Sequence, residues 1–176
     1  WTTFLDLAAV PETLDILGPA GAASIRQAQI RYTYDLGGGH SLTGAIENPE
    51  TDVTAAAGSS MAINHYPDLI AVWNYKAGWG HLNARALTRN LAVKNIPGAA
   101  AYEENRWGYG VAASGNWKPF QDAKEAYGKD NILFSFGGGL GIGRYIGEAA
   151  NLAGATDATN NIHLLNSWGG YAGVQH

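Results

Sequence analysis

Four arginines recur on the polar face of alternating stretches of this sequence, together with two glutamines. The set comprises Arg31, Arg85, Arg89 and Arg106, with Gln27 and Gln29 on the face of Arg31. A guanidinium group binds a carboxylate in a planar fork, and several arginines around a narrow passage would concentrate anions there. These residue types therefore indicate recognition of carboxylate groups, either of a solute or of an acidic segment of the same chain.

An acidic segment of this kind precedes the first arginine of the set. Residues 1–21 do not alternate after Phe4, and their leucines are interspersed with three carboxylates, Asp6, Glu12 and Asp15. Pro11 before Glu12 suits the first turn of a short helix, and the glycines and proline of 18–21 end the segment. We predict a folded loop whose carboxylates either pair with the arginines or form the opposing wall of a constriction.

Other chemistry is not indicated by the motifs present. Gly137 to Gly143 has no G-x-G-x-x-G register and no following P-loop lysine, so strand glycines explain it better than a nucleotide site. The five histidines lack metal-ligand spacing and are expected in exposed turns or loops, and no G-x-S-x-G motif occurs. We predict no catalytic residue, no metal site and no cofactor.

The stretch from Arg106 to Trp117 shows which element carries the arginines. Every second residue is apolar, with Trp107 and Trp117 at the ends and small or aliphatic residues between them. Period two predicts a β-strand, and ten steps of about 3.3 Å, tilted by about 40°, span roughly 25 Å. That is about the height of the apolar band of a transmembrane β-barrel between its two aromatic girdles.

The same alternation predicts further strands at 24–35, 41–48, 68–76, 81–91, 131–147 and 162–174. Ile70, Val72 and Leu87 break the polar faces, and Arg144 falls on an apolar face, where we expect a bulge or a strand end. Long loops are expected near 49–66, 92–105 and 148–161, alternating with short turns. This alternation of loop lengths is typical of outer-membrane barrels, so we predict a single antiparallel β-barrel domain over 1–176, with strands in 22–176.

Composition agrees with this fold class and excludes others. Charged residues make up only 15% of the chain, and the net charge of −4 argues against a nucleic-acid-binding protein. No apolar run approaches the roughly 20 residues of a spanning helix, whereas barrel strands alternate and escape such a scan. The sequence starts at Trp1 and stops within an expected strand, so we expect an incomplete barrel.

Two alternatives remain open. A soluble or surface β-rich binding or adhesin module would also alternate, and would use exposed tryptophans for binding. Against it, the polar faces carry Gln, Asn, Ser, Thr and Arg rather than many Lys and Glu, which suits a water-filled lumen. The second alternative is an eight-stranded barrel with a filled interior, serving adhesion or anchoring.

Several segments together resemble the DcaP-like family of Gram-negative outer-membrane porins. They are Leu5 to Asp15, Gly18 to Gly21, Arg26 to Tyr34, Glu47 to Asp52 and Gly141 to Ile146. The resemblance implies a homotrimer of barrels of about 16 strands, of which about eight are expected here, surrounded by outer-membrane lipid. It also implies passive uptake of small anionic solutes such as dicarboxylates, a constriction loop at 1–21, and Arg31 facing the lumen.

Overall fold

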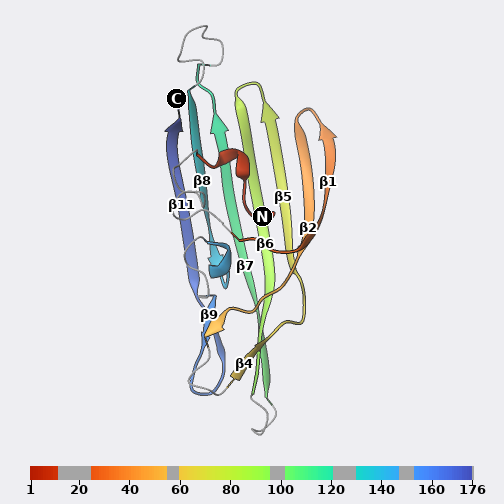
Figure 1. Ribbon diagram of the computed structural model, residues 1–176, viewed down its shortest axis with the longest axis vertical. Coiled ribbons are helices and arrows are strands. Elements are labelled where there is room, and N and C mark those ends of the chain that lie inside the picture. The colour runs from red at the N-terminus through yellow and green to blue at the C-terminus, as the bar shows by residue number, and fades with distance from the viewer. Residues whose placement is uncertain (12–24, 55–59, 96–101, 121–129, 147–152, 176) are drawn as a thin grey trace.

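The computed structural model describes residues 1–11, 25–54, 60–95, 102–120, 130–146 and 153–175. Its main feature is one antiparallel sheet of eight strands, ordered β1-β2-β5-β6-β7-β8-β11, with β4 paired to β6 (Figure 1). The strands are β1 (Gln29–Gly37), β2 (His40–Glu47), β4 (Ser60–Ile63), β5 (Asp68–Ala77), β6 (Gly80–Asn95), β7 (Glu103–Trp117), β8 (Asn131–Leu140) and β11 (Asn166–Gln175). The predicted all-β, antiparallel class is confirmed, and the barrel is not closed within the described residues.

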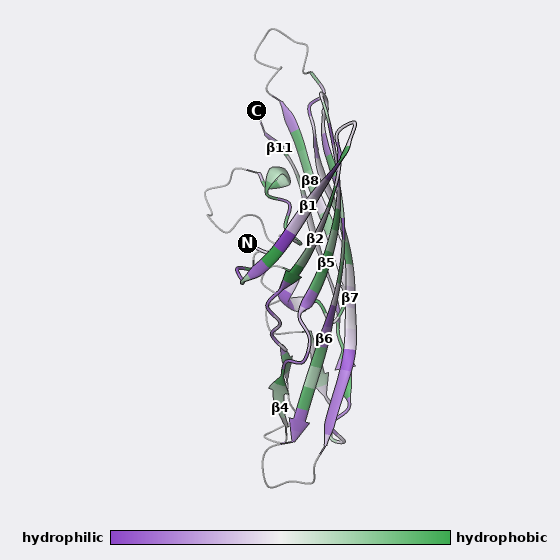
Figure 2. Ribbon diagram, turned by 90° about the vertical axis from the view of Figure 1, so that its right-hand side faces the viewer, coloured by the Kyte–Doolittle hydropathy of each residue, from purple (hydrophilic) through white to green (hydrophobic). Residues whose placement is uncertain are grey.

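The short and long connections lie at opposite ends of the sheet, as the sequence predicts. The β1–β2 and β5–β6 turns lie at the upper end in Figure 1, and the long connections lie at the lower end. The long connections contain short strands of their own, β3 (Val53–Thr54), β9 (Gly154–Thr156) and β10 (Ile162–Leu164), which form a second, three-stranded sheet. Figure 2 shows the large sheet nearly edge-on, with the N-terminal segment on one side of it.

The two faces of the sheet have opposite chemistry. Large apolar side chains are exposed along the outer face, the face away from the N-terminal segment. Those on the strands include Ile30, Tyr32, Tyr34, Leu42, Ile46, Leu69, Trp73, Leu82, Trp107, Tyr109, Val111, Trp117, Phe136, Trp168 and Val174. Aromatic residues lie towards both ends of the strands, which is the arrangement of interfacial belts on a membrane protein.

Strand ends differ from the sequence prediction in several places. The predicted strand at 131–147 is wrong beyond Leu140, because Gly141 takes a positive φ of 70° and residues Gly143–Tyr145 form the 3₁₀ turn η3. β1 begins at Gln29 rather than 24, and the predicted strand at 162–174 is divided into β10 and β11. β6 and β7 both extend into the loop expected at 92–105, because their ladder continues to Lys94 and Glu103.

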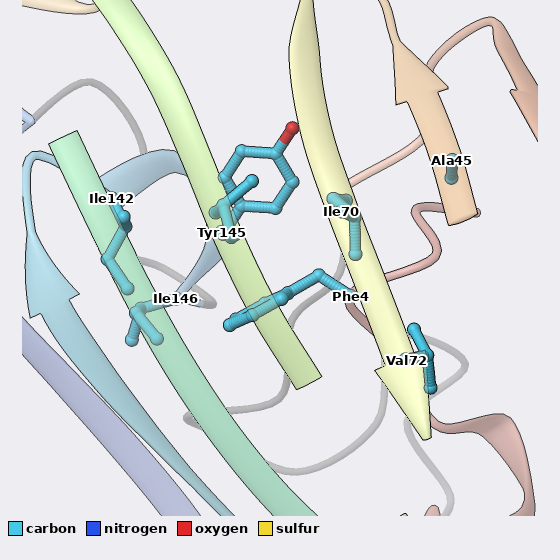
Figure 3. Close-up of a cluster of buried hydrophobic side chains, with 8 residues drawn as sticks. Phe4, Ala45, Ile70, Val72, Ile142, Tyr145 and Ile146 are labelled. Atoms are coloured by element: carbon cyan, nitrogen blue, oxygen red, sulfur yellow. The ribbon is translucent and has the colours of Figure 1, made fainter. Parts of the chain in front are cut away.

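A buried apolar cluster lies on the inner face of the sheet and joins distant parts of the chain. It contains Phe4, Ala45, Ile70, Val72, Leu87, Ile142, Tyr145 and Ile146. In Figure 3, Phe4 and Tyr145 lie between Ile142 and Ile146 on one side and Ile70 and Val72 on the other. The three residues that broke the predicted polar faces, Ile70, Val72 and Leu87, are therefore the wall against which Phe4 and η3 pack.

A glycine on the wall leaves room for this close packing. A Cβ atom at Gly110 would lie 2.6 Å from Cδ1 of Ile142, a distance that real contacts do not reach. The small residues of β7 thus have a specific function on the inner face. They allow the segment after β8 to fold back onto the sheet.

Candidate functional site: the inner face of the sheet

The N-terminal segment is held to the inner face by hydrogen bonds and by Phe4. The Oγ1 of Thr2 and the backbone N–H of Thr3 donate to the Glu47 carboxylate at 2.6 and 2.5 Å. Phe4 is 1% exposed, and its ring meets the ring of Tyr145 edge-on at 5.7 Å between centroids. The predicted folded loop at 1–21 is described only to residue 11; there it carries the 3₁₀ turn η1 (Leu7–Ala9).

Asp6 anchors the same segment through its carboxylate. Its Oδ2 accepts a hydrogen bond from the Oγ of Ser114 at 2.6 Å and lies 2.8 Å from Nε2 of His81, and all three side chains are buried. Burial, the largest single influence, would raise the pKa of the Asp6 carboxyl, but the hydrogen bonds from His81 and Ser114, together with the nearby charges of His81 and Arg85, outweigh it and hold the pKa below its usual value. Asp6 also caps η1, since its Oδ1 accepts from the N–H of Ala8 at 3.2 Å.

Arg85 lies beneath the N-terminal segment rather than free in the lumen. It is 5% exposed, and its Nη1 donates to the carbonyl of Phe4 at 2.8 Å. Its guanidinium carbon lies 5.7 Å from the centroid of the Phe4 ring, and Nη2 reaches the Oγ of Ser135 at 3.5 Å. Arg85 therefore binds the segment through its backbone and ring rather than through a carboxylate.

Arg89 is fully buried and pairs with carboxylates of the same wall. Its Nη1 lies 2.8 Å from Oδ1 of Asp52, and its Nε lies 3.5 Å from Oδ2 of Asp68. Nη2 also donates to the carbonyl of Glu50. The partners expected for the arginines were the acids of 1–21, but for Arg89 they lie on β5 and on the connection after β2.

A third buried arginine, Arg144, extends the network of Arg89 to Gln27. Arg144 pairs with Glu50 at 2.8 Å and donates to the Oε1 of Gln27 at 2.7 Å. Gln27 in turn donates to the hydroxyl of Tyr145 at 2.8 Å, and that hydroxyl donates to Asp68 at 2.7 Å. Burial, followed by the nearby Asp68 carboxylate, raises the pKa of the Tyr145 hydroxyl well above its usual value, so it stays protonated and donating.

An open hollow of about 500 Å³ lies between the N-terminal segment and the inner face of β1, β2, β5 and β6. Arg31 lines it from β1, Lys76 lines it from β5, and hydroxyl groups of Thr33, Ser41 and Thr43 lie between. Gln29 also lines it and donates to the carbonyl of Trp1 at 2.7 Å. Within the described part of the chain, neither Arg31 nor Lys76 makes an ion pair.

Arg106 lies at the other end of the wall. It is exposed near the start of β7, and its Nη2 lies 2.9 Å from Oε1 of Glu104. Glu12 and Asp15 fall outside the described residues. The six side chains predicted to line a pore thus occupy three places: Arg31 and Gln29 at the hollow, Arg85, Arg89 and Gln27 in buried networks, and Arg106 near a strand end.

Sequence reasoning missed three of the residues at this site. His81 was expected in an exposed turn or loop, which is wrong, because it is 6% exposed and bonded to Asp6. Its position on the polar face of β6, in step with Asn83 and Arg85, was the available signal. Lys76 lies on the polar face of β5 in the same way, whereas nothing in the local pattern of Arg144 indicates an inward fold.

Among the described residues, no group of three or more His, Cys, Asp and Glu residues is placed to hold a metal ion. No described helix is long and apolar enough to cross a membrane.

The fold is similar to one solved structure. The chain matches the crystal structure of the outer membrane channel DcaP of Acinetobacter baumannii with a TM-score of 0.77 and 22% sequence identity. The match covers 98% of this chain and 45% of that one, so the chain spans less than half the length of the channel. No family model and no curated protein matches the sequence. The likeness shows the fold, an antiparallel sheet of the kind that forms an outer-membrane β-barrel.

Proposed function

We propose that this chain forms part of the wall of a porin, a passive diffusion channel for small hydrophilic solutes in the bacterial outer membrane. The observation that carries the proposal is the inverted burial on the two faces of the sheet. Val111 on the outer face is 64% exposed, whereas Arg85 on the inner face is 5% exposed. An apolar surface of this extent is stable in contact with lipid, whereas in water it would promote aggregation. The polar groups of the opposite face suit a water-filled lumen.

The charges at the hollow favour anions among the solutes. Arg31 and Lys76 face open space without ion pairs among the described residues, and Asp6, the one carboxylate among the described lining residues, is bonded to His81. A positive wall raises the local concentration of anions, and an arginine binds carboxylate oxygens in a planar fork. We infer a preference for small anions such as dicarboxylates, and a homotrimer by analogy with porin architecture.

Reconstitution tests the channel itself. The full-length protein, extracted from membranes in detergent and added to a planar lipid bilayer, should give stepwise conductance increases with an ohmic current. Conductance that never exceeds that of detergent alone, from protein shown by circular dichroism to be folded, would overturn the proposal. A protein that stays soluble without detergent would instead support the soluble binding module.

The apolar cluster on the inner face favours one second candidate. Phe4, Tyr145 and the residues around them fill part of the interior, as they would in a filled barrel that serves adhesion or anchoring. Such a barrel would also insert into the bilayer, but it would conduct no ions. The bilayer recording therefore separates the two candidates directly.

A further inference from the structure

The cations on the inner face divide into two groups by what surrounds them. Arg85, Arg89 and Arg144 are buried, and each binds oxygens of the protein: a carbonyl of the N-terminal segment, two carboxylates, or Glu50. Their charges are shielded from the lumen by the segments that they hold. A solute that passes along the wall would not reach them.

Arg31 and Lys76 form the second group. Arg31 projects from β1 and Lys76 from β5, and both line the same open hollow. Both residues are exposed, and within the described residues neither forms an ion pair. Among the described residues, no counter-charge is paired with their guanidinium and ammonium groups, which line the passage.

The described residues that line the hollow contain little that would cancel these two cations, and Asp35, on the same face of β1 beyond Thr33, is not among them. Neutral hydroxyl and amide groups from Thr33, Thr43 and Asn74 line the hollow between the two strands. Among the described lining residues, Asp6 supplies the one carboxylate, and its Oδ2 lies 2.8 Å from Nε2 of His81. The wall of the hollow is thus positive on the side of β1 and β5.

We propose that Arg31 and Lys76 are the residues that set the charge selectivity of the pore, whereas Arg85 and Arg89 are positioning residues that hold the inserted segments. The proposal rests on the proposed channel function. Of the four arginines that the sequence pattern singles out, it keeps only Arg31 for selectivity, and it adds Lys76. It also places the route of the solute along β1, β2 and β5.

The test is the reversal potential of full-length channels in a planar bilayer under a tenfold gradient of potassium chloride. Arg31→Gln and Lys76→Gln should each lower the chloride-to-potassium permeability ratio by roughly twofold, because one unit charge about 8 Å away, screened by about 0.1 M salt, changes the local concentrations of chloride and potassium by about 1.5-fold each in opposite directions. The double variant should lower it roughly fourfold, with a larger effect at low salt. Lys94→Gln is the matched control; Lys94 is exposed, at the far end of β6 opposite Glu103, and its loss should leave the ratio unchanged.

Two outcomes overturn the assignment while leaving the channel intact. One is a reversal potential that is the same in the double variant as in the wild type, with single-channel current preserved. The other is an equal shift in Lys94→Gln, which would indicate a general surface-charge effect. A wild-type protein that does not conduct would instead refute the proposed function itself.

Discussion

Replacing Phe4 with alanine should release the N-terminal segment from the inner face. The ring is 1% exposed and packs against Tyr145, Ile70 and Val72 in the apolar cluster. Removing a buried phenylalanine side chain costs about 3 to 5 kcal/mol, because the cavity left behind collapses only partly. At 1.36 kcal/mol per factor of ten, the ratio of docked to undocked segment should fall by roughly 100- to 5,000-fold.

Hydrogen exchange of the full-length protein, followed by mass spectrometry, measures this ratio through the peptide that covers residues 2–9. In the docked segment the N–H of Thr3 is bound to Glu47 and that of Ala9 to the carbonyl of Asp6. Phe4→Ala should speed their exchange by the factor given above, while β-strand peptides stay protected. Leu7→Ala is the matched control, since Leu7 belongs to the same segment but is 60% exposed.

Equal protection of residues 2–9 in Phe4→Ala and in the wild type would refute the reasoning. It would mean that the hydrogen bonds alone hold the segment, and that the apolar cluster is not its anchor. Loss of protection in Leu7→Ala to the same extent would refute it too. In that case any truncation would loosen the segment, whether or not the side chain was buried.

Three further predictions concern charge and backbone. Because the folded-state pKa of Asp6 is depressed, its contribution to docking should persist above pH ~4, the usual unfolded value, and be lost as pH falls through the lower folded value. Hydrogen exchange of residues 2–9, measured as a function of pH, checks this. Asp6→Asn should remove the pH dependence. Gly141→Ala should lower the free energy of thermal unfolding by about 1 to 3 kcal/mol, because the backbone φ at Gly141 is 70°. Gly44→Ala, which would place its Cβ atom with nothing within 4 Å, should change that free energy little. Arg89→Met should destabilise the barrel by about 3 to 5 kcal/mol in a urea titration, since it leaves two buried carboxylates without their counter-charge; a loss under about 1 kcal/mol would contradict that role.

The orientation of the strand side chains could be predicted because it depends on parity alone. Successive side chains of a strand point to opposite faces, so each strand divides into an apolar and a polar face. The character of these faces assigned Val111 and Arg85 to opposite sides without knowledge of the strand order. The same rule explains why Arg89 meets Asp68. Leu69 pairs with Thr88 in the ladder, so the next step of the register brings Asp68 beside Arg89.

What covers the inner face could not be predicted in this way. Phe4 and Tyr145 are 141 positions apart, and no periodicity relates a residue in a turn to its neighbour on the inner face of the sheet. The exceptions Ile70, Val72 and Leu87 showed that something apolar lies against the wall, but not which segment supplies it. The partnership of Asp6 with His81 depends equally on how the loop folds, so parity alone could not reveal it.

These inserted segments have a physical reason in a large barrel. The diameter of a barrel is fixed by the number and tilt of its strands, so its wall cannot narrow the passage at one height. Segments folded onto the inner face can do so, provided that their own polar groups are satisfied there. The polar groups of the N-terminal segment form hydrogen bonds with Glu47, His81 and Arg85, and the ring of Phe4 makes an apolar contact in place of water. The described wall is therefore covered at the apolar cluster and open at the hollow, so the proposed charge selection would act at the open part, where Arg31 and Lys76 lie.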